Sequence, residues 1–204
     1  MINVLRRTMI QRSTAALCGL ALSSVVASTA YAADMPQVSL KTSMGDIVLE
    51  LDPEHAPKTV ANFLQYVKSG FYKGTIFHRV IDGFMIQGGG YDVKMKDKKT
   101  NKPIVNESDN GLKNVAYSIA MARTQDHNSA TSQFFINVGD NAALDYPGRD
   151  GSGYAVFGKV ISGQEVVDKI KVVLVDDIHG QQNVPVVPIL IQSATVVGAA
   201  KSVK

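Results

Sequence analysis

The amino-acid sequence predicts a mainly β fold, a closed antiparallel β-barrel of eight strands capped by two α-helices. Short runs rich in β-branched and aromatic residues recur along the chain, whereas apolar residues follow helical spacing in only two segments. No internal repeat and no second domain divides residues 33–198. Because closing a sheet removes its exposed edges, a barrel is the favoured arrangement for many short strands.

The strands follow from local patterns. Residues 38–42 and 47–51 alternate apolar and polar side chains around the turn-like residues 43–46, which predicts an opening hairpin. The remaining strands are expected at residues 75–81, 84–87, 115–122, 134–138, 154–160 and 188–197.

Two segments predict helices. The first begins at Pro57, which is favoured at the first helical position, and ends at Gly70. Its apolar residues Val60, Phe63 and Val67 recur at helical spacing. The second helix is expected over residues 164–171.

Two long segments predict loops. Residues 91–103 carry five lysines, and a run of like charges is more often a solvated loop than a binding surface for an acidic partner. Residues 141–153 are rich in Gly and Asp and include Pro147, which predicts a long connection.

Residues 1–32 have the composition of a secretory signal peptide. Three arginines and no acidic residue come first, an apolar stretch follows from about residue 15 to 27, and Ala30-Tyr31-Ala32 comes last. This order predicts cleavage before Ala33. The apolar stretch is shorter than the ~20 residues of a membrane span, so a retained anchor is the less favoured alternative. Translation could begin at Met1 or at Met9, and either start leaves a plausible leader.

Removing the leader changes the charge balance. The chain has 21 Lys and Arg, and the loss of three leader arginines leaves 18 against 18 acidic residues. A neutral protein gives no reason to expect nucleic acid or an anionic membrane as partner. The single cysteine, Cys18, lies in the leader, so no disulfide can form in the exported chain. We expect one monomeric domain over residues 33–198 and a flexible tail over residues 199–204.

The run from Arg79 to Gln87 is the most informative for function. Arg79 ends an apolar strand, an Asp-Gly turn follows, and Phe84, Met85 and Gln87 come next. A cationic donor beside apolar side chains, with no nucleophile or acid–base pair nearby, suits a reaction that makes and breaks no covalent bond.

Five motifs resemble, in order and spacing, those of the cyclophilins, which are peptidyl-prolyl cis-trans isomerases. The similarity is greatest to the exported cyclophilins of Gram-negative bacteria. The motifs are Phe77 to Gly90, Ala120-Met121-Ala122-Arg123, Ser132-Gln133-Phe134-Phe135-Ile136, Leu144-Asp145 and Val156-Phe157-Gly158-Lys159-Val160.

The resemblance implies a role for each matching residue. Arg79 would be the catalytic arginine. Four residues would form the proline pocket: Phe84, Met85, Phe135 and Leu144. Four others would hold the substrate backbone: Gln87, Ala122, Arg123 and Gln133. The resemblance also implies a cofactor-free and metal-free enzyme that acts in the periplasm on proline-containing unfolded or flexible polypeptides.

Two positions depart from the eukaryotic cyclophilins. Tyr154 stands where they have a histidine that lines the pocket, and its hydroxyl could serve part of that role. Ala143 stands where they have a tryptophan, which puts strong inhibition by cyclosporin in doubt. This chain is also longer between Arg123 and Gln133 and between Asp145 and Tyr154, which could alter sequence preference.

The implied chemistry needs only a positioned donor. Amide resonance gives rotation about an X–Pro bond a barrier of ~18–20 kcal/mol. When the amide twists, the proline nitrogen regains a lone pair that a guanidinium can bond. That bond strengthens as the amide twists, so it favours the transition state over the ground state.

Other functions fit the sequence less well. The main alternative is a proline-binding module or holdase chaperone without turnover, although pure binding would not need Arg79. A lipocalin-like carrier would need a hollow barrel, and Asp126-His127 with Ser129 only faintly resembles a hydrolase set. Gly88 to Gly90 suggest a turn or bulge rather than a phosphate cradle. Strand alternation places His78 and Phe134 on the side opposite Arg79 and Phe135, so we expect a satisfied interior histidine.

Overall fold

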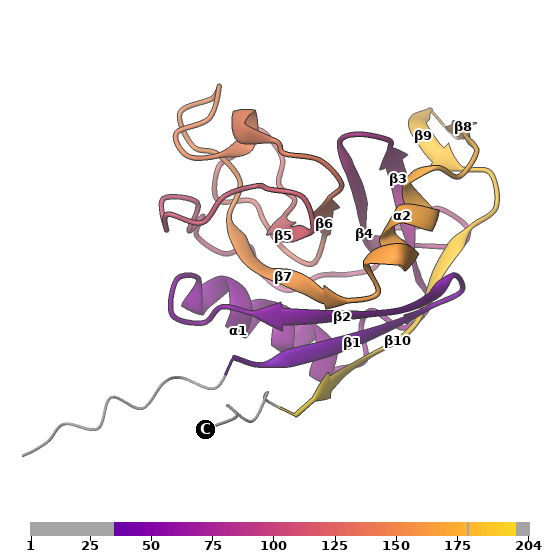
Figure 1. Cartoon of the computed structure of the whole chain (residues 1–204), viewed down its shortest axis with the longest axis horizontal. Coiled ribbons are helices and arrows are strands. Elements are labelled where there is room, and N and C mark those ends of the chain that lie inside the picture. Colours follow the sequence, from indigo (N-terminus) through magenta and orange to yellow (C-terminus); the bar gives the residue numbers. More distant parts are fainter. Residues whose placement is uncertain (1–34, 179, 199–204) are drawn as a thin grey trace, which may run out of the picture. The chain divides into compact units, whose positions relative to one another are not determined.

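The computed structural model describes residues 35–178 and 180–198, and in this part of the chain eight strands form a closed antiparallel barrel. Their order around the barrel is β1-β10-β3-β4-β6-β5-β7-β2 (Figure 1). The predicted fold class is therefore confirmed. The strands are β1 (Gln37–Thr42), β2 (Gly45–Leu51), β3 (Thr75–Ile81), β4 (Met85–Asp92), β5 (Ser118–Met121), β6 (Phe134–Asn137), β7 (Val156–Ser162) and β10 (Ile189–Val197).

Some elements differ from the sequence-based expectation. β4 continues through the three glycines to Asp92, and β5 covers only the second half of its expected range. A separate hairpin of β8 (Val175–Ile178) and β9 (Gln181–Pro185) was not expected, because most of its residues are not buried and they show no apolar alternation. The expected loop 141–153 contains the 3₁₀ helix η1 (Ala142–Leu144). The predicted leader and tail, residues 1–32 and 199–204, lie outside the described residues.

Helices α1 (Pro57–Lys68) and α2 (Gln164–Lys171) lie apart from each other (Figure 1). The buried side chains of both belong to the same apolar cluster as the interior residues of the strands. Since the barrel wall is closed, these side chains reach the interior through its open ends, and the helices cap it. No helix in the described part of the chain is long and apolar enough to cross a membrane.

The barrel interior is filled with side chains. One row of directly opposed residues runs across β3, β4, β6 and β5 as Val80, Ile86, Ile136 and Ile119, each at most 1% exposed. Phe63 of α1 packs against Phe134 at 5.6 Å between ring centroids, edge to face. The barrel interior is therefore a packed core, unlike the hollow, ligand-holding barrel that a lipocalin-like carrier needs.

Candidate active site

A β-bulge in β3 decides where Arg79 points. The pairing of β3 with β4 shifts by one residue between Phe77, opposite Gly88, and Arg79, opposite Gln87. Phe77 and Val80 both belong to the interior core although they are three residues apart, whereas regular alternation would place them on opposite faces. The extra residue at the bulge therefore reverses the face that the following side chains take. Arg79 is consequently on the outer face of the barrel, where it is half-buried.

The outer face carries a continuous row of site residues. Arg79 lies opposite Gln87, Gln87 opposite Phe135, and Phe135 opposite Ala120 on successive strands. Directly opposed residues share a face of the sheet, so this row forms the floor of the site. Phe135 and Met85 belong to a small apolar cluster separate from the barrel core, whereas Phe134 belongs to the core. The predicted opposite placement of Phe134 and Phe135 is confirmed.

The floor and the loops above it enclose a central pocket of about 110 Å³. It is far smaller than the roughly 300–1,000 Å³ of a pocket for a drug-sized ligand, and suits a small ring. Of the ten residues predicted for the site, nine line it: Arg79, Phe84, Met85, Gln87, Ala122, Arg123, Phe135, Leu144 and Tyr154.

The tenth predicted residue, Gln133, lines an adjoining polar pocket of about 130 Å³ together with Gln87 and Ala122. Its Oε1 accepts a hydrogen bond from Nε2 of Gln87 at 3.0 Å, and Gln87 Oε1 in turn accepts one from Arg79 Nη1 at 3.4 Å. Gly90 explains part of the glycine run, because a Cβ there would lie 2.5 Å from Nε2 of Gln133. Gly90 makes room for this amide chain, and the whole run lies within β4, where the pairing with β3 shifts.

The two arginines of the central pocket differ in how many donors are engaged. In the described structure the Arg79 guanidinium makes only its hydrogen bond to Gln87, and no carboxylate lies within ion-pair distance. A guanidinium has five N–H donors. Arg79 therefore presents most of its hydrogen-bonding capacity to whatever occupies the pocket.

Arg123 has its donors engaged within the protein. Nε and Nη2 donate to the carbonyl of Gly153 at 3.0 and 2.8 Å, and Nη1 donates to the carbonyl of Thr124 at 3.0 Å. Nη2 also lies 2.5 Å from Asp150 Oδ2, and the side chain is only 2% exposed. Its guanidinium carbon lies 4.3 Å from the centre of the Tyr154 ring. The Arg123 side chain thus fastens the loop 145–153 and supports one wall of the pocket.

The contact with Arg123 lowers the pKa of Asp150. The hydrogen bond from Arg123 lowers the pKa of the Asp150 carboxyl to about 2, with further lowering by the backbone N–H groups of Ser152 and Gly153. The carboxylate is therefore charged throughout the neutral range. Asp150 and Gly153 were missed in the sequence, because their partner Arg123 lies more than twenty residues away in the chain.

His78 lies beside the bulge and is 4% exposed. Its ring packs against Tyr91 at 4.6 Å between centroids. Burial, and then the charge of Arg79, lower the pKa of His78 to about 4, against an opposing contribution from the backbone of Ile76. The expected burial is confirmed, but the expectation of a satisfied ring is wrong, because Nδ1 has no hydrogen-bond partner among the described residues.

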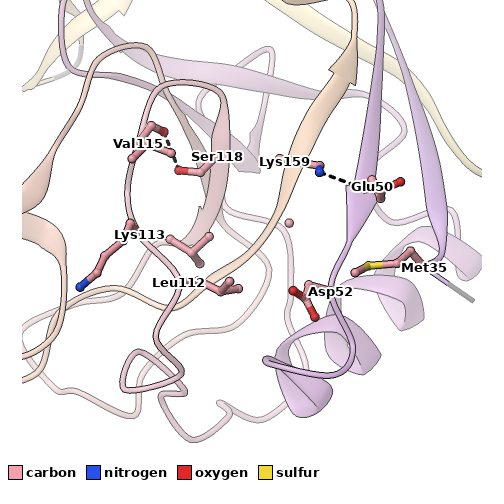
Figure 2. Close-up of a pocket in the computed structure, with 10 residues that line it drawn as sticks. Met35, Glu50, Asp52, Leu112, Lys113, Val115, Ser118 and Lys159 are labelled. Carbon is pink, nitrogen blue, oxygen red and sulfur yellow. Dashed lines mark hydrogen bonds and ion pairs between the residues drawn. The ribbon is translucent and has the colours of Figure 1, made fainter. Parts of the chain in front are cut away.

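A further hollow of about 260 Å³ lies between β2, β7 and the loop before β5 (Figure 2). Its charged residues pair with neighbours: Lys159 with Glu50 at 3.3 Å, Lys113 with Asp145 at 3.7 Å, and Asp52 with His55 at 2.9 Å. No arginine lines it. This hollow lacks the free cationic donor that distinguishes the central pocket.

The hydrolase alternative has no geometric support. The hydroxyl of Ser129 donates to the carbonyl of Asp126 at 2.6 Å and also lies 2.8 Å from the hydroxyl of Thr124. Among the described residues none of its hydrogen bonds involves His127. No group of three or more metal-ligating side chains is found in the part of the chain that the structure describes.

Residues 37–196 match the model of the family described as cyclophilin type peptidyl-prolyl cis-trans isomerase/CLD. The chain belongs to the cyclophilins. A peptidyl-prolyl cis-trans isomerase A of Dickeya dadantii is 57% identical over 86% of this chain and 93% of its own. Isomerase B of Escherichia coli is 53% identical over 78% of this chain and 98% of its own. The crystal structure of a Cryptosporidium parvum cyclophilin has a TM-score of 0.67 at 28% identity, covering 80% of this chain and 98% of that one.

This cyclophilin is accordingly a peptidyl-prolyl cis-trans isomerase. Its central pocket combines apolar side chains with the guanidinium of Arg79. The holdase alternative, which lacks turnover, is disfavoured by this family membership.

We predict that Arg123→Met raises KM for a proline peptide while kcat changes little, because the wall formed by Tyr154 and Leu144 loses its support. The free energy of unfolding should also fall by about 1–3 kcal/mol, since the carbonyl of Gly153 loses two donors. Steady-state kinetics and urea unfolding measure both effects. Arg123→Lys should restore KM only in part, because an ammonium lacks the planar fork. The exposed Lys102→Met serves as a control for charge loss, and an unchanged KM in Arg123→Met would show that the loop needs no fastening.

We predict that His78 makes the fold less stable between pH 6.5 and about 4. In this range the unfolded chain binds a proton at His78 that the folded chain does not, so stability falls as the pH falls. The full effect is about 3 kcal/mol. Urea unfolding at several pH values should show a weaker dependence in His78→Phe, whereas His127→Gln, at an exposed histidine, should keep it. Identical profiles for His78→Phe and the wild type would refute the buried neutral ring.

Proposed function

We propose that this cyclophilin accelerates rotation about X–Pro bonds in unfolded or flexible exported polypeptides, and that Arg79 is its catalytic residue. The observation that carries the proposal is the free guanidinium of Arg79 at the edge of a small apolar pocket. Phe84, Met85, Phe135 and Leu144 would hold the proline ring.

The backbone on either side of the proline would be held by polar groups next to Arg79. Gln87 and Gln133 form an ordered amide chain along the polar pocket. The backbone N–H of Ala122 donates to the carbonyl of Gln133 at 3.0 Å, which leaves the Ala122 carbonyl as a candidate acceptor.

The main-chain hydrogen bond between Ala122 and Gln133 also keeps this edge of the site in place, because it ties the loop after β5 to the segment before β6. Arg123 follows Ala122 in the same loop. It would contribute through its position under Tyr154 and not through a direct bond to substrate.

The catalytic step would use the change in the proline nitrogen as the amide twists. In the planar amide the nitrogen lone pair is delocalised, and at the twisted geometry it becomes a hydrogen-bond acceptor. A donor of Arg79 bonds it only then, which stabilises the transition state more than the ground state. The chain would work as a monomer and without a cofactor.

The proposed site of action is the periplasm. The support is the order of basic, apolar and small residues in 1–32, which is typical of a cleaved leader. Exported chains arrive unfolded, and X–Pro isomerisation takes tens to hundreds of seconds without catalysis. An isomerase in that compartment would therefore act on folding intermediates of other exported proteins.

We predict that Arg79→Ala lowers kcat/KM by about 10²–10³-fold, the usual effect of removing one donor to a transition state. Arg79→Lys should recover part of the loss. The measurement is isomerisation of a short X–Pro peptide by the purified protein, with circular dichroism to show that each variant is folded. Lys99→Ala, at an exposed lysine of the loop 91–103, is the matched control and should keep full turnover.

Two outcomes of this experiment would contradict the proposal. If Arg79→Ala folds normally and keeps full activity, the assignment of the catalytic arginine is wrong. If the wild type binds proline peptides but does not turn them over, the protein is a binding module.

We also predict export with cleavage before Ala33. The full chain, expressed in a Gram-negative host, should be recovered from the periplasmic fraction with Ala33 at its N-terminus by mass spectrometry. Leu20→Arg interrupts the apolar stretch and should leave the uncleaved protein in the cytoplasm. Recovery of the uncleaved wild-type chain in the membrane fraction would instead indicate a retained anchor.

A further inference from the structure

A side pocket of about 320 Å³ adjoins the central pocket. It shares Phe84, Leu144 and Tyr154 with the central pocket and has no lining residue in common with the polar pocket. The central pocket thus lies between two further hollows of different chemistry. A peptide whose proline occupies the middle one would extend toward both.

The side pocket is built from fixed parts. Asn141 donates from Nδ2 to the carbonyl of Phe84 at 2.7 Å and to Oδ1 of Asn137 at 2.6 Å, which joins its loop to the start of β4. Asp150 is held by Arg123, and its Oδ1 accepts from the backbone N–H of Gly153 at 3.2 Å. Gly153 has a φ of +63° and lies so close to Tyr146 that a Cβ would be 2.7 Å from its backbone nitrogen. These contacts hold the segment 141–153 in a fixed position around the side pocket.

The walls of the side pocket are mainly apolar. Phe84, Ala143 and Leu144 supply aliphatic and aromatic surface, and the ring of Tyr154 supplies more. The methyl group of Ala143 is the smallest of these side chains, so it leaves the space open. A large apolar side chain is the occupant that such walls favour.

The charged residues at the rim of the side pocket indicate which kind of apolar side chain it would bind. Asp150 is paired with Arg123, whereas no described carboxylate lies within ion-pair distance of the exposed Arg149. A guanidinium that is not paired with a carboxylate can stack on an aromatic face. Apolar walls in a pocket that is also lined by an unpaired guanidinium suit an aromatic side chain better than an aliphatic one.

We propose that the side pocket binds an aromatic side chain of the substrate, one or two positions from the proline, and so sets sequence preference. This inference rests on the proposed function, because it takes the central pocket as the proline site. Successive residues of an extended peptide advance by about 3.3 Å, so a residue at either distance reaches an adjoining hollow.

The test compares peptides that differ only beside the proline. Phe, Ala or Glu is placed at each of the two positions on either side, and both Kd and kcat/KM are measured with the full exported protein. At one of these positions we expect the Phe peptide to have a kcat/KM about tenfold higher, and a Kd about tenfold lower, than the Ala peptide. Ala143→Trp, which fills the pocket, should reduce that ratio to within about twofold.

Ala142→Trp is the matched control. It adds the same ring at the neighbouring exposed residue, which does not line the pocket, and should keep the preference for Phe. Arg149→Gln should weaken the preference for Phe without creating one for Ala.

The outcomes separate the two proposals. Turnover without a preference for Phe at any position overturns the aromatic subsite and leaves the isomerase intact. A preference for Glu that disappears in Arg149→Gln also overturns it, in favour of a carboxylate site. A preference for Phe in Kd that is lost in Ala143→Trp supports the subsite even if no turnover is found, in which case only the proposed catalytic function fails.

Discussion

The position of Arg79 depends on one extra residue in β3. With regular alternation from Phe77, Arg79 would point into the barrel, where a guanidinium without a partner would cost several kcal/mol of stability. The bulge between Phe77 and Arg79 keeps Phe77 and Val80 in the core and places Arg79 outside. The same closed, densely packed wall that stabilises the fold thus presents a cation at its outer surface.

The two arginines of the site have different roles, which are catalysis for Arg79 in the proposed function and support of the pocket wall for Arg123. Arg79 stands on a strand of the rigid barrel and has most of its donors free. Arg123 is buried, and its four hydrogen bonds are made to Gly153, Thr124 and Asp150. Residue type alone does not distinguish these roles. The distinction lies in how many donors the protein itself satisfies.

Much of this architecture could be predicted from the sequence, because the signals were local. The alternation that separates Phe134 from Phe135 and the two helical segments depend on neighbouring residues only. The hydrogen bonds of Arg123, the unpaired Nδ1 of His78 and the bulge in β3 depend on which distant segments meet. The β8–β9 hairpin was missed for a different reason, since exposed strands do not need an apolar pattern.

The division of the site between strands and loops has a consequence for specificity. The floor, with Arg79, Gln87 and Phe135, is fixed by the backbone pairing of β3, β4 and β6. The side pocket is formed largely by the segment 141–154, which is held by side-chain hydrogen bonds. Under the proposed function, replacing residues in that segment would change which side chain beside the proline is accepted while Arg79 keeps its position. Catalysis and sequence preference would then be governed by different parts of the chain.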